Sequence, residues 1–175
     1  MPALARAAFT HGNAWKTNMS ADIRVALYQP DIAANTGAIM RLCAGLGAGL
    51  DIIEPCGFVL DDRRLRRVAM DYIEHLSFVR HRSWEDFIAG TGTRRLILLT
   101  TKGGIAYHRF AFRRDDILLA GRESAGVPED VHARADARLL VPMQPGVRSL
   151  NVAMSAAIVL AEALRQTESL VASLP

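Results

Sequence analysis

Residues 23–53 read IRVALYQPDIAANTGAIMRLCAGLGAGLDII, which is an apolar run, a polar loop, an amphipathic stretch and a second apolar run. The runs Ile23–Tyr28 and Leu50–Ile53 each predict a buried strand. Between them, Asn35–Leu46 predicts a helix, because one stripe of it carries Ile39, Leu42, Cys43 and Leu46. A strand, a helix and a strand in this order are typical of an α/β domain with a parallel sheet.

The ends of this helix carry recognisable signals. We expect Asn35 to cap its N-terminus and Gly47 to end it, and we expect Cys43 to lie in the core. The segment GLGAG at 45–49 has the glycine content of a dinucleotide-binding loop, but such a loop follows a strand and precedes a helix. Here the order is reversed, which argues against an ordinary NAD-binding or class I methyltransferase domain.

The alternation continues along the chain. Further strands are predicted at Leu76–Arg80, Leu96–Thr100, Ile117–Ala120 and Arg138–Val141. Further helices are predicted at Asp61–Met70, at Ser83–Ala89 with Ser83 as its cap, and at Asn151–Arg165. The sequence therefore predicts an α/β fold with a mostly parallel sheet flanked by helices. We expect a flexible N-terminal extension at 1–20, one domain at 21–168 and a C-terminal tail at 169–175.

Composition excludes several classes of protein. Of the 175 residues, 50% are hydrophobic and 22% are charged, which excludes a disordered chain. No apolar stretch is long enough for a membrane helix. The two cysteines are too few for a disulfide scaffold or a four-ligand zinc site, and we expect a reducing cytoplasm. The five histidines show no paired spacing and no serine stands in a nucleophile elbow, so we expect neither a metal site nor a catalytic triad.

Positive charge is concentrated in the middle of the chain. Residues 63–114 contain twelve basic and four acidic side chains. The pairs that could form a phosphate-binding face are Arg63-Arg64, Arg66-Arg67, Arg94-Arg95 and Arg113-Arg114. A solvated, arginine-rich surface would give the same pattern, so charge alone leaves both interpretations open.

Three loops bear polar residues and glycines. The first is Pro30–Gly37, with Arg41 following in the helix; the second is Gly121–Pro128, after a predicted strand; the third is Val141–Asn151, which leads into the last helix. Ligands of open α/β sheets bind beyond the carboxyl ends of strands, so loops in these positions suit a binding site. Each has a simpler interpretation: a capping residue at Asn35 or Asn151, a surface arginine at Arg41, and plain connections.

Taken in order, the segments Asn35-Thr36-Gly37 with Arg41, Gly121–Pro128, and Pro142–Ala153 resemble the three signature motifs of the SpoU branch of the SPOUT RNA methyltransferases. The resemblance covers 23–168. With no added RNA-binding domain in the sequence, the chain is similar to the small tRNA wobble-nucleotide ribose methyltransferases of that branch. It departs from some of them at 122–124, where Arg-Glu-Ser stands in place of Pro-Glu-Thr.

This resemblance implies a fold with a C-terminal deep trefoil knot, which is a rare exception to unknotted topology. It implies a homodimer whose active sites take residues from both subunits. It also implies that S-adenosylmethionine binds mainly to backbone groups of the loops after three strands. The cofactor-binding residues carried onto this chain are Leu99, Thr100, Gly121, Glu123, Gly126, Val141, Met143, Ser149 and Leu150.

The implied activity is 2′-O-methylation of a ribose in tRNA, at the wobble nucleotide of the anticodon stem-loop. The implied catalytic residues are Arg41, Asn35, Glu123, Ser149 and Asn151, and the implied RNA contacts are Arg41, Lys102 and Arg148. In the family the arginine corresponding to Arg41 is often proposed as the base. Because a guanidinium stays protonated, we prefer a clamp that stabilises negative charge on the 2′-oxygen. A base role would need a cationic field that lowers the pKa of Arg41.

Three alternatives stay open. The nearest is a ribosomal RNA ribose 2′-O-methyltransferase. The second is a catalytically silent RNA-binding relative, although the presence of all five implied catalytic residues favours activity. The third is a generic nucleotide-binding α/β protein, which would require the match of three separate loops to be accidental.

Overall fold

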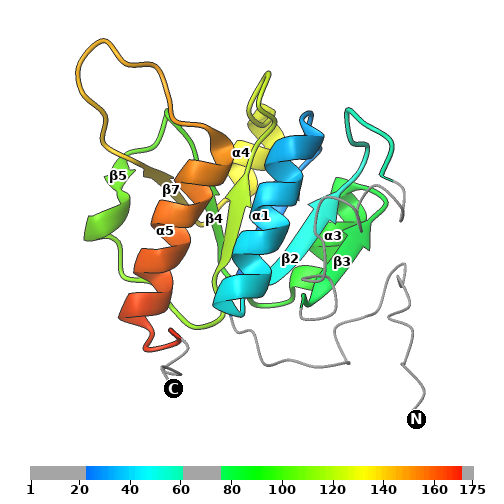
Figure 1. Ribbon diagram of the computed structural model, residues 1–175, viewed down its shortest axis with the longest axis horizontal. Coiled ribbons are helices and arrows are strands. Elements are labelled where there is room, and N and C mark those ends of the chain that lie inside the picture. The colour runs from blue at the N-terminus through cyan, green and yellow to red at the C-terminus, as the bar shows by residue number, and fades with distance from the viewer. Residues whose placement is uncertain (1–22, 61–75, 171–175) are drawn as a thin grey trace.

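The computed structural model describes residues 23–60 and 76–170, which form one sheet with helices on both faces (Figure 1). The strand order is β3-β2-β1-β6-β4-β7-β5, and every strand pairing in this described part is parallel. The predicted α/β class and parallel sheet are confirmed. The strands are β1 (Arg24–Tyr28), β2 (Gly49–Ile53), β3 (Phe78–His81), β4 (Leu96–Leu99), β5 (Ile105–Ala106), β6 (Ile117–Ala120) and β7 (Ala137–Leu140).

The helices form two layers. One face of the sheet is covered by α1 (Ala33–Leu46) and α5 (Val152–Gln166), which pack against each other in the foreground of Figure 1. The other face carries α3 (Trp84–Thr91) and α4 (Glu129–Arg134), and a short 3₁₀ turn at Tyr107–Arg109 follows β5. None of these described helices is long and apolar enough to cross a membrane.

Each layer encloses its own apolar core. Under α1 and α5 the core includes Ile39, Met40, Cys43, Val159 and Leu160. Under α3 and α4 it is smaller and centres on Phe87 and Val131. The central strands are buried on both faces, which explains why β6, and β1 after Arg24, are continuous apolar runs rather than alternating ones. Cys43 lies in the core as expected, and burial raises the pKa of its thiol to about 12.

The predicted N-terminus of α1 is wrong. The helix begins at Ala33, Ile32 occupies the cap position, and no side chain caps it. Asn35 therefore lies inside the first turn, where its side-chain amide donates to Glu123 instead. The predicted helix end is confirmed, because Gly47 adopts a left-handed φ of 71° that suits glycine.

Ser83 does cap α3, since its hydroxyl accepts a hydrogen bond from the Asp86 N–H at 3.2 Å. Two elements were missed: β5 has two residues and α4 has six, of which one is buried. Segments this short are not long enough to show a hydrophobic periodicity that would predict them. The strand predicted at Leu76–Arg80 begins at Phe78. The predicted helix Asp61–Met70 and the extension at 1–20 lie outside the described residues.

A buried ionic cluster ties the outer strands to the centre of the sheet. The fully buried carboxylate of Asp51 on β2 accepts hydrogen bonds from Arg24 on β1, from Nε at 2.6 Å and Nη2 at 3.2 Å. Nε2 of His81 on β3 lies 2.9 Å from Asp51 Oδ1. Burial alone would raise the pKa of Asp51, but Arg24 and His81 together lower it. The carboxylate is therefore ionised and paired on three adjacent strands.

Asp51→Asn should lower the free energy of unfolding by about 3–5 kcal/mol, because it leaves a buried guanidinium without its counter-charge. Urea unfolding measures this loss. Since folding lowers the pKa of Asp51, its contribution is present above the unfolded pKa of about 3.9 and is lost as pH falls through the folded value. The wild type should thus lose more stability than the variant below about pH 4.

Glu162→Gln is the matched control. It removes a carboxylate from an ion pair with Arg165, whose side chain is 65% exposed on α5. Its cost should be at most about 1 kcal/mol. Equal losses in the two variants would contradict the role assigned to the buried cluster.

Candidate active site

A cavity of about 450 Å³ opens at the carboxyl ends of β4, β6 and β7. The loops that follow these three strands form its walls, and the first turn of α1 and the N-terminus of α5 complete them. This is the edge at which open parallel sheets bind ligands. The volume lies within the range of about 300–1,000 Å³ for small-molecule sites.

The nine residues predicted to bind a cofactor all line this cavity, from all three loops. Four of the five predicted catalytic residues line it as well, namely Asn35, Glu123, Ser149 and Asn151. The structure thus brings the three separated motifs together, while the role of each residue stays a prediction. Residues that line the cavity but were missed are Ile32, Leu98, Thr101, Ala120, Arg122, Val127, Leu139, Val152, Ser155 and Val159.

Side-chain hydrogen bonds connect the loops. Glu123 Oε1 accepts from Asn35 Nδ2 at 3.0 Å, and Asn35 Oδ1 accepts from Asn151 Nδ2 at 2.9 Å. Asn151 Oδ1 accepts in turn from the N–H of Ala153 at 2.8 Å and so caps α5. Asn35, Glu123 and Asn151 therefore form one polar series across the mouth of the cavity.

The second loop is a closed turn. Arg122 N–H donates to Gly126 O at 2.9 Å, and Gly126 N–H donates back to Arg122 O at 2.8 Å. Gly126 has a φ of 68°, and a Cβ on Gly121 would lie 2.7 Å from the carbonyl carbon of Gly126. Both glycines are thus required by the turn itself.

Asp31 is a further residue that the sequence did not single out. Its Oδ1 accepts from Arg122 Nη2 at 2.9 Å. Hydrogen bonds from Ser124 and Arg122 lower the pKa of Asp31 to about 2. The partners are 91 residues apart in the chain, so no local pattern could have revealed the contact.

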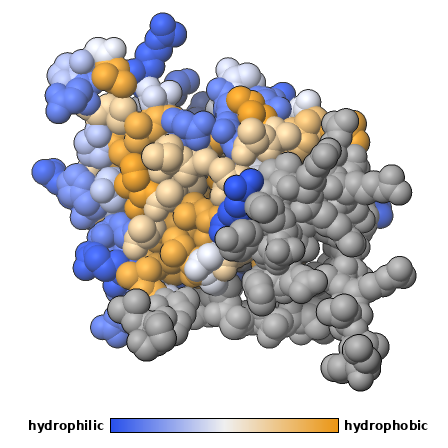
Figure 2. All heavy atoms as spheres, viewed as in Figure 1, coloured by the Kyte–Doolittle hydropathy of each residue, from blue (hydrophilic) through white to orange (hydrophobic). Residues whose placement is uncertain are grey.

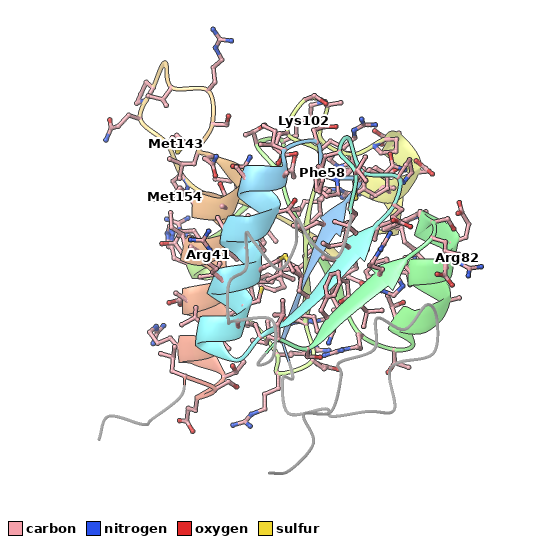
Figure 3. The ribbon with its side chains drawn as sticks, turned by 45° about the vertical axis from the view of Figure 1, so that its right-hand side comes forward. Arg41, Phe58, Arg82, Lys102, Met143 and Met154 are labelled. Carbon is pink, nitrogen blue, oxygen red and sulfur yellow. The ribbon has the colours of Figure 1, made fainter. Side chains whose placement is uncertain are left out.

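Arg41 does not line the cavity of its own chain. It stands six residues after Asn35, about 9 Å further along the helix axis. Figure 3 shows it well below the loops at the top of the view, where Lys102 and Met143 lie. Lys102 and Arg148 are exposed next to the cavity-lining residues Thr101 and Ser149.

Two of the basic clusters lie at the amino ends of the strands, on the opposite side of the sheet from the cavity. Arg94 and Arg95 directly precede β4, and Arg113 and Arg114 lie shortly before β6. Arg95 pairs with the buried Asp116 at 2.7 Å, so this guanidinium holds the chain rather than facing the cavity. The clusters at 63–67 lie outside the described residues. Among the described residues, no three His, Cys, Asp or Glu side chains gather in a way that could hold a metal ion.

Comparison with known proteins gives consistent results. A tRNA (cytidine(34)-2′-O)-methyltransferase of Beijerinckia indica is 57% identical over 149 residues, which cover 83% of this chain and 92% of that protein. A structure described as giving insights into the 2-OH methylation of C/U34 on tRNA superposes with a TM-score of 0.78 at 37% identity, over 82% of this chain and 95% of the other.

A third relative was solved with its cofactor. The SpoU methyltransferase AviRb of Streptomyces viridochromogenes, in complex with AdoMet, has a TM-score of 0.73 at 29% identity, over 83% of this chain and 60% of its own. The model of the SpoU rRNA methylase family matches residues 22–161. Together with three signature loops that meet at one cavity, this match shows that the chain belongs to the SpoU rRNA methylase family.

Proposed function

We propose that this chain transfers a methyl group from S-adenosylmethionine to the ribose 2′-oxygen of the wobble nucleotide of a tRNA. The observation that carries the proposal is the polar series of Asn35, Glu123 and Asn151, which joins the three family motifs around one cavity. The relative at 57% identity bears the name of this activity and aligns over nearly its whole length.

The residues of the cavity fit the cofactor. Leu99, Val141 and Leu150 would supply apolar surface for an adenine ring. Ser149 makes no hydrogen bond with any described residue, so its hydroxyl remains available for a polar group of the ligand. When bound, S-adenosylmethionine supplies an electrophilic methyl group on a positively charged sulfur.

The protein then has to orient the nucleotide and stabilise the charge that develops on the 2′-oxygen. Asn35, Glu123 and Asn151 fix the loops relative to one another. Arg41 binds phosphate and stabilises the negative charge on the 2′-oxygen while the hydroxyl proton passes to solvent water. Lys102 and Arg148, exposed beside the cavity, contact the phosphates of the anticodon stem-loop.

The position of Arg41 favours a homodimer. Because Arg41 lies outside the cavity of its own chain, we place it at the cavity of the partner subunit. Apolar side chains gather over α1 and α5 on the face seen in Figure 2, and Met154 of α5 is 59% exposed. An apolar helical face of this kind is typical of a subunit interface.

We also propose the trefoil knot of the family. The strand β7 lies on one side of β4, whereas α5, which follows it, packs against β6 and α1 on the other side. Residues 141–151 must therefore return across the end of β4.

Both thiols, Cys43 and Cys56, are free, which agrees with the cytoplasm, where tRNA is found.

Mass spectrometry of tRNA tests the activity. Cells that lack the gene should lose one ribose methyl group at the wobble position of one or more tRNAs, and the gene should restore it. A ribose methyl lost from ribosomal RNA instead would favour the alternative substrate. No lost methyl in either RNA would favour a silent RNA-binding relative.

Arg41→Ala should lower kcat for methyl transfer by about a hundredfold or more while leaving cofactor affinity unchanged, because it removes stabilisation of the developing charge. Calorimetry with S-adenosylmethionine and transfer of labelled methyl to tRNA give the two quantities. An equal loss of cofactor binding would instead mean that Arg41 shapes the pocket.

Mixed dimers of Arg41→Ala and Glu123→Ala are the matched control for the shared site. If each site combines Arg41 of one subunit with Glu123 of the other, heterodimers contain one intact site, and random mixing should restore about a quarter of wild-type activity. No recovery would place both residues in one subunit's site.

The affinity for tRNA should fall steeply with salt, since phosphate neutralisation releases counterions. Lys102→Ala and Arg148→Ala should each reduce the slope of log affinity against log salt by about one, whereas Arg94→Ala, at the opposite edge of the sheet, should not. Filter binding over a salt series measures this, and equal slopes in all variants would contradict the assigned contacts.

A further inference from the structure

Asp31 joins the loop after β1 to the loop after β6. Its side chain accepts hydrogen bonds from Arg122, through Nη2 at 2.9 Å and Nε at 3.3 Å. It also accepts from the hydroxyl of Ser124 and from the Ser124 N–H at 3.1 Å. One carboxylate therefore holds both ends of the three-residue segment 122–124.

The residue between these partners is Glu123. Its Oε2 accepts from the backbone N–H of Asp31 at 2.8 Å, while its Oε1 accepts from Asn35. Each loop thus binds the other through a side chain. Asp31 accepts hydrogen bonds from the loop after β6, and Glu123 accepts one from the loop after β1. Because Glu123 stands between two anchored neighbours, its carboxylate has little freedom to turn away from Asn35.

The loop that presents Asp31 is itself held in an uncommon shape. Gln29 has a φ of 44°, in the left-handed region that residues other than glycine rarely adopt. Its Oε1 accepts from Arg122 Nη1 at 3.4 Å, so Arg122 binds this strained turn as well as Asp31. A strained conformation persists where surrounding contacts enforce it.

The pair does little for the stability of the fold. The side chain of Arg122 is 38% exposed and that of Asp31 is 18% exposed, and ion pairs near solvent contribute little to stability. Hydrogen bonds from Ser124 and Arg122 keep the pKa of Asp31 at about 2, so the contact persists at every physiological pH. The Asp31–Arg122 pair therefore matters more for the position of the segment 122–124 than for the free energy of unfolding.

We propose that Asp31 is a positioning residue for methyl transfer, which holds the segment 122–124 so that Glu123 aligns Asn35 and Asn151 at the mouth of the cavity. The inference rests on the proposed function. It adds to that function a residue that lies outside the wall of the cavity and acts through Glu123.

Asp31→Asn tests it with the smallest change of shape. An amide keeps one acceptor but turns a donor towards the donors of Arg122 or Ser124. We expect kcat for tRNA methylation to fall between about tenfold and a hundredfold, because small displacements of orienting groups have costs of this size. KM for tRNA and the melting temperature should stay close to the wild-type values. Unchanged kcat in the folded variant would overturn the proposal.

Arg122→Gln and the double variant provide a second test. Because the two residues share a contact, the double variant should lose less activity than the two single losses combined. Additive losses would mean that the two residues act independently, and would overturn the proposal. Arg122→Gln also carries the test if Asp31→Asn fails to fold. The control is Glu162→Gln, about 16 Å further along α5 than Asn151, which removes a similar arginine-paired carboxylate and should leave kcat unchanged.

A measurement without substrate separates this inference from the proposed function. The side-chain amide signals of Asn35 and Asn151 in NMR spectra should shift in Asp31→Asn, although neither side chain hydrogen-bonds Asp31. Unmoved signals would reduce Asp31 to a local loop contact and overturn the proposal. Wild-type protein that methylates no RNA would refute the proposed function, whereas these signals would still decide whether Asp31 positions Asn35.

Discussion

The parallel sheet is the constraint on which the rest of the molecule depends. Since every strand pairing of the described residues is parallel, the loops after β4, β6 and β7 all leave the sheet at the carboxyl ends of the strands. Asn35, Glu123 and Asn151 then join segments that are 88 and 116 residues apart in the chain. The sheet brings the loops close to one another, and the hydrogen bonds among these two amides and one carboxylate hold the loops in the arrangement that forms the cavity.

Much of this arrangement could be predicted from the sequence. Ile117–Ala120 was predicted at its observed bounds, because a strand buried on both faces is a short, uninterrupted apolar run. The predicted order around GLGAG, with a helix before it and a strand after it, is the order observed. The residues that line the cavity followed from a different source, the resemblance of three loops to a known family, since polar loop residues carry no period of their own.

Apart from the short elements β5 and α4, the failures share a physical cause, which is competition from distant partners. Asn35 has the side chain of a good helix cap, but Glu123 and Asn151 bind it instead, and α1 begins two residues earlier without a side-chain cap. Asp31 and Arg122 form a pair that only the folded chain brings together. The density of arginine left a phosphate-binding face and a solvated surface both open, and neither interpretation foresaw that Arg95 pairs with the buried carboxylate of Asp116. Local spacing does not encode such choices.

The trio of Arg24, Asp51 and His81 constrains how this sheet can diverge. Losing Arg24 or Asp51 leaves the charge of the other buried without its counter-charge, whereas replacing the cluster by neutral side chains of similar volume is often nearly neutral for stability. Substitutions at these positions should therefore be inherited as a set. Sequences intermediate between the ionic and the neutral version should be scarce among homologues, and covariation at the three sites would report the adjacency of β1, β2 and β3 without any structure.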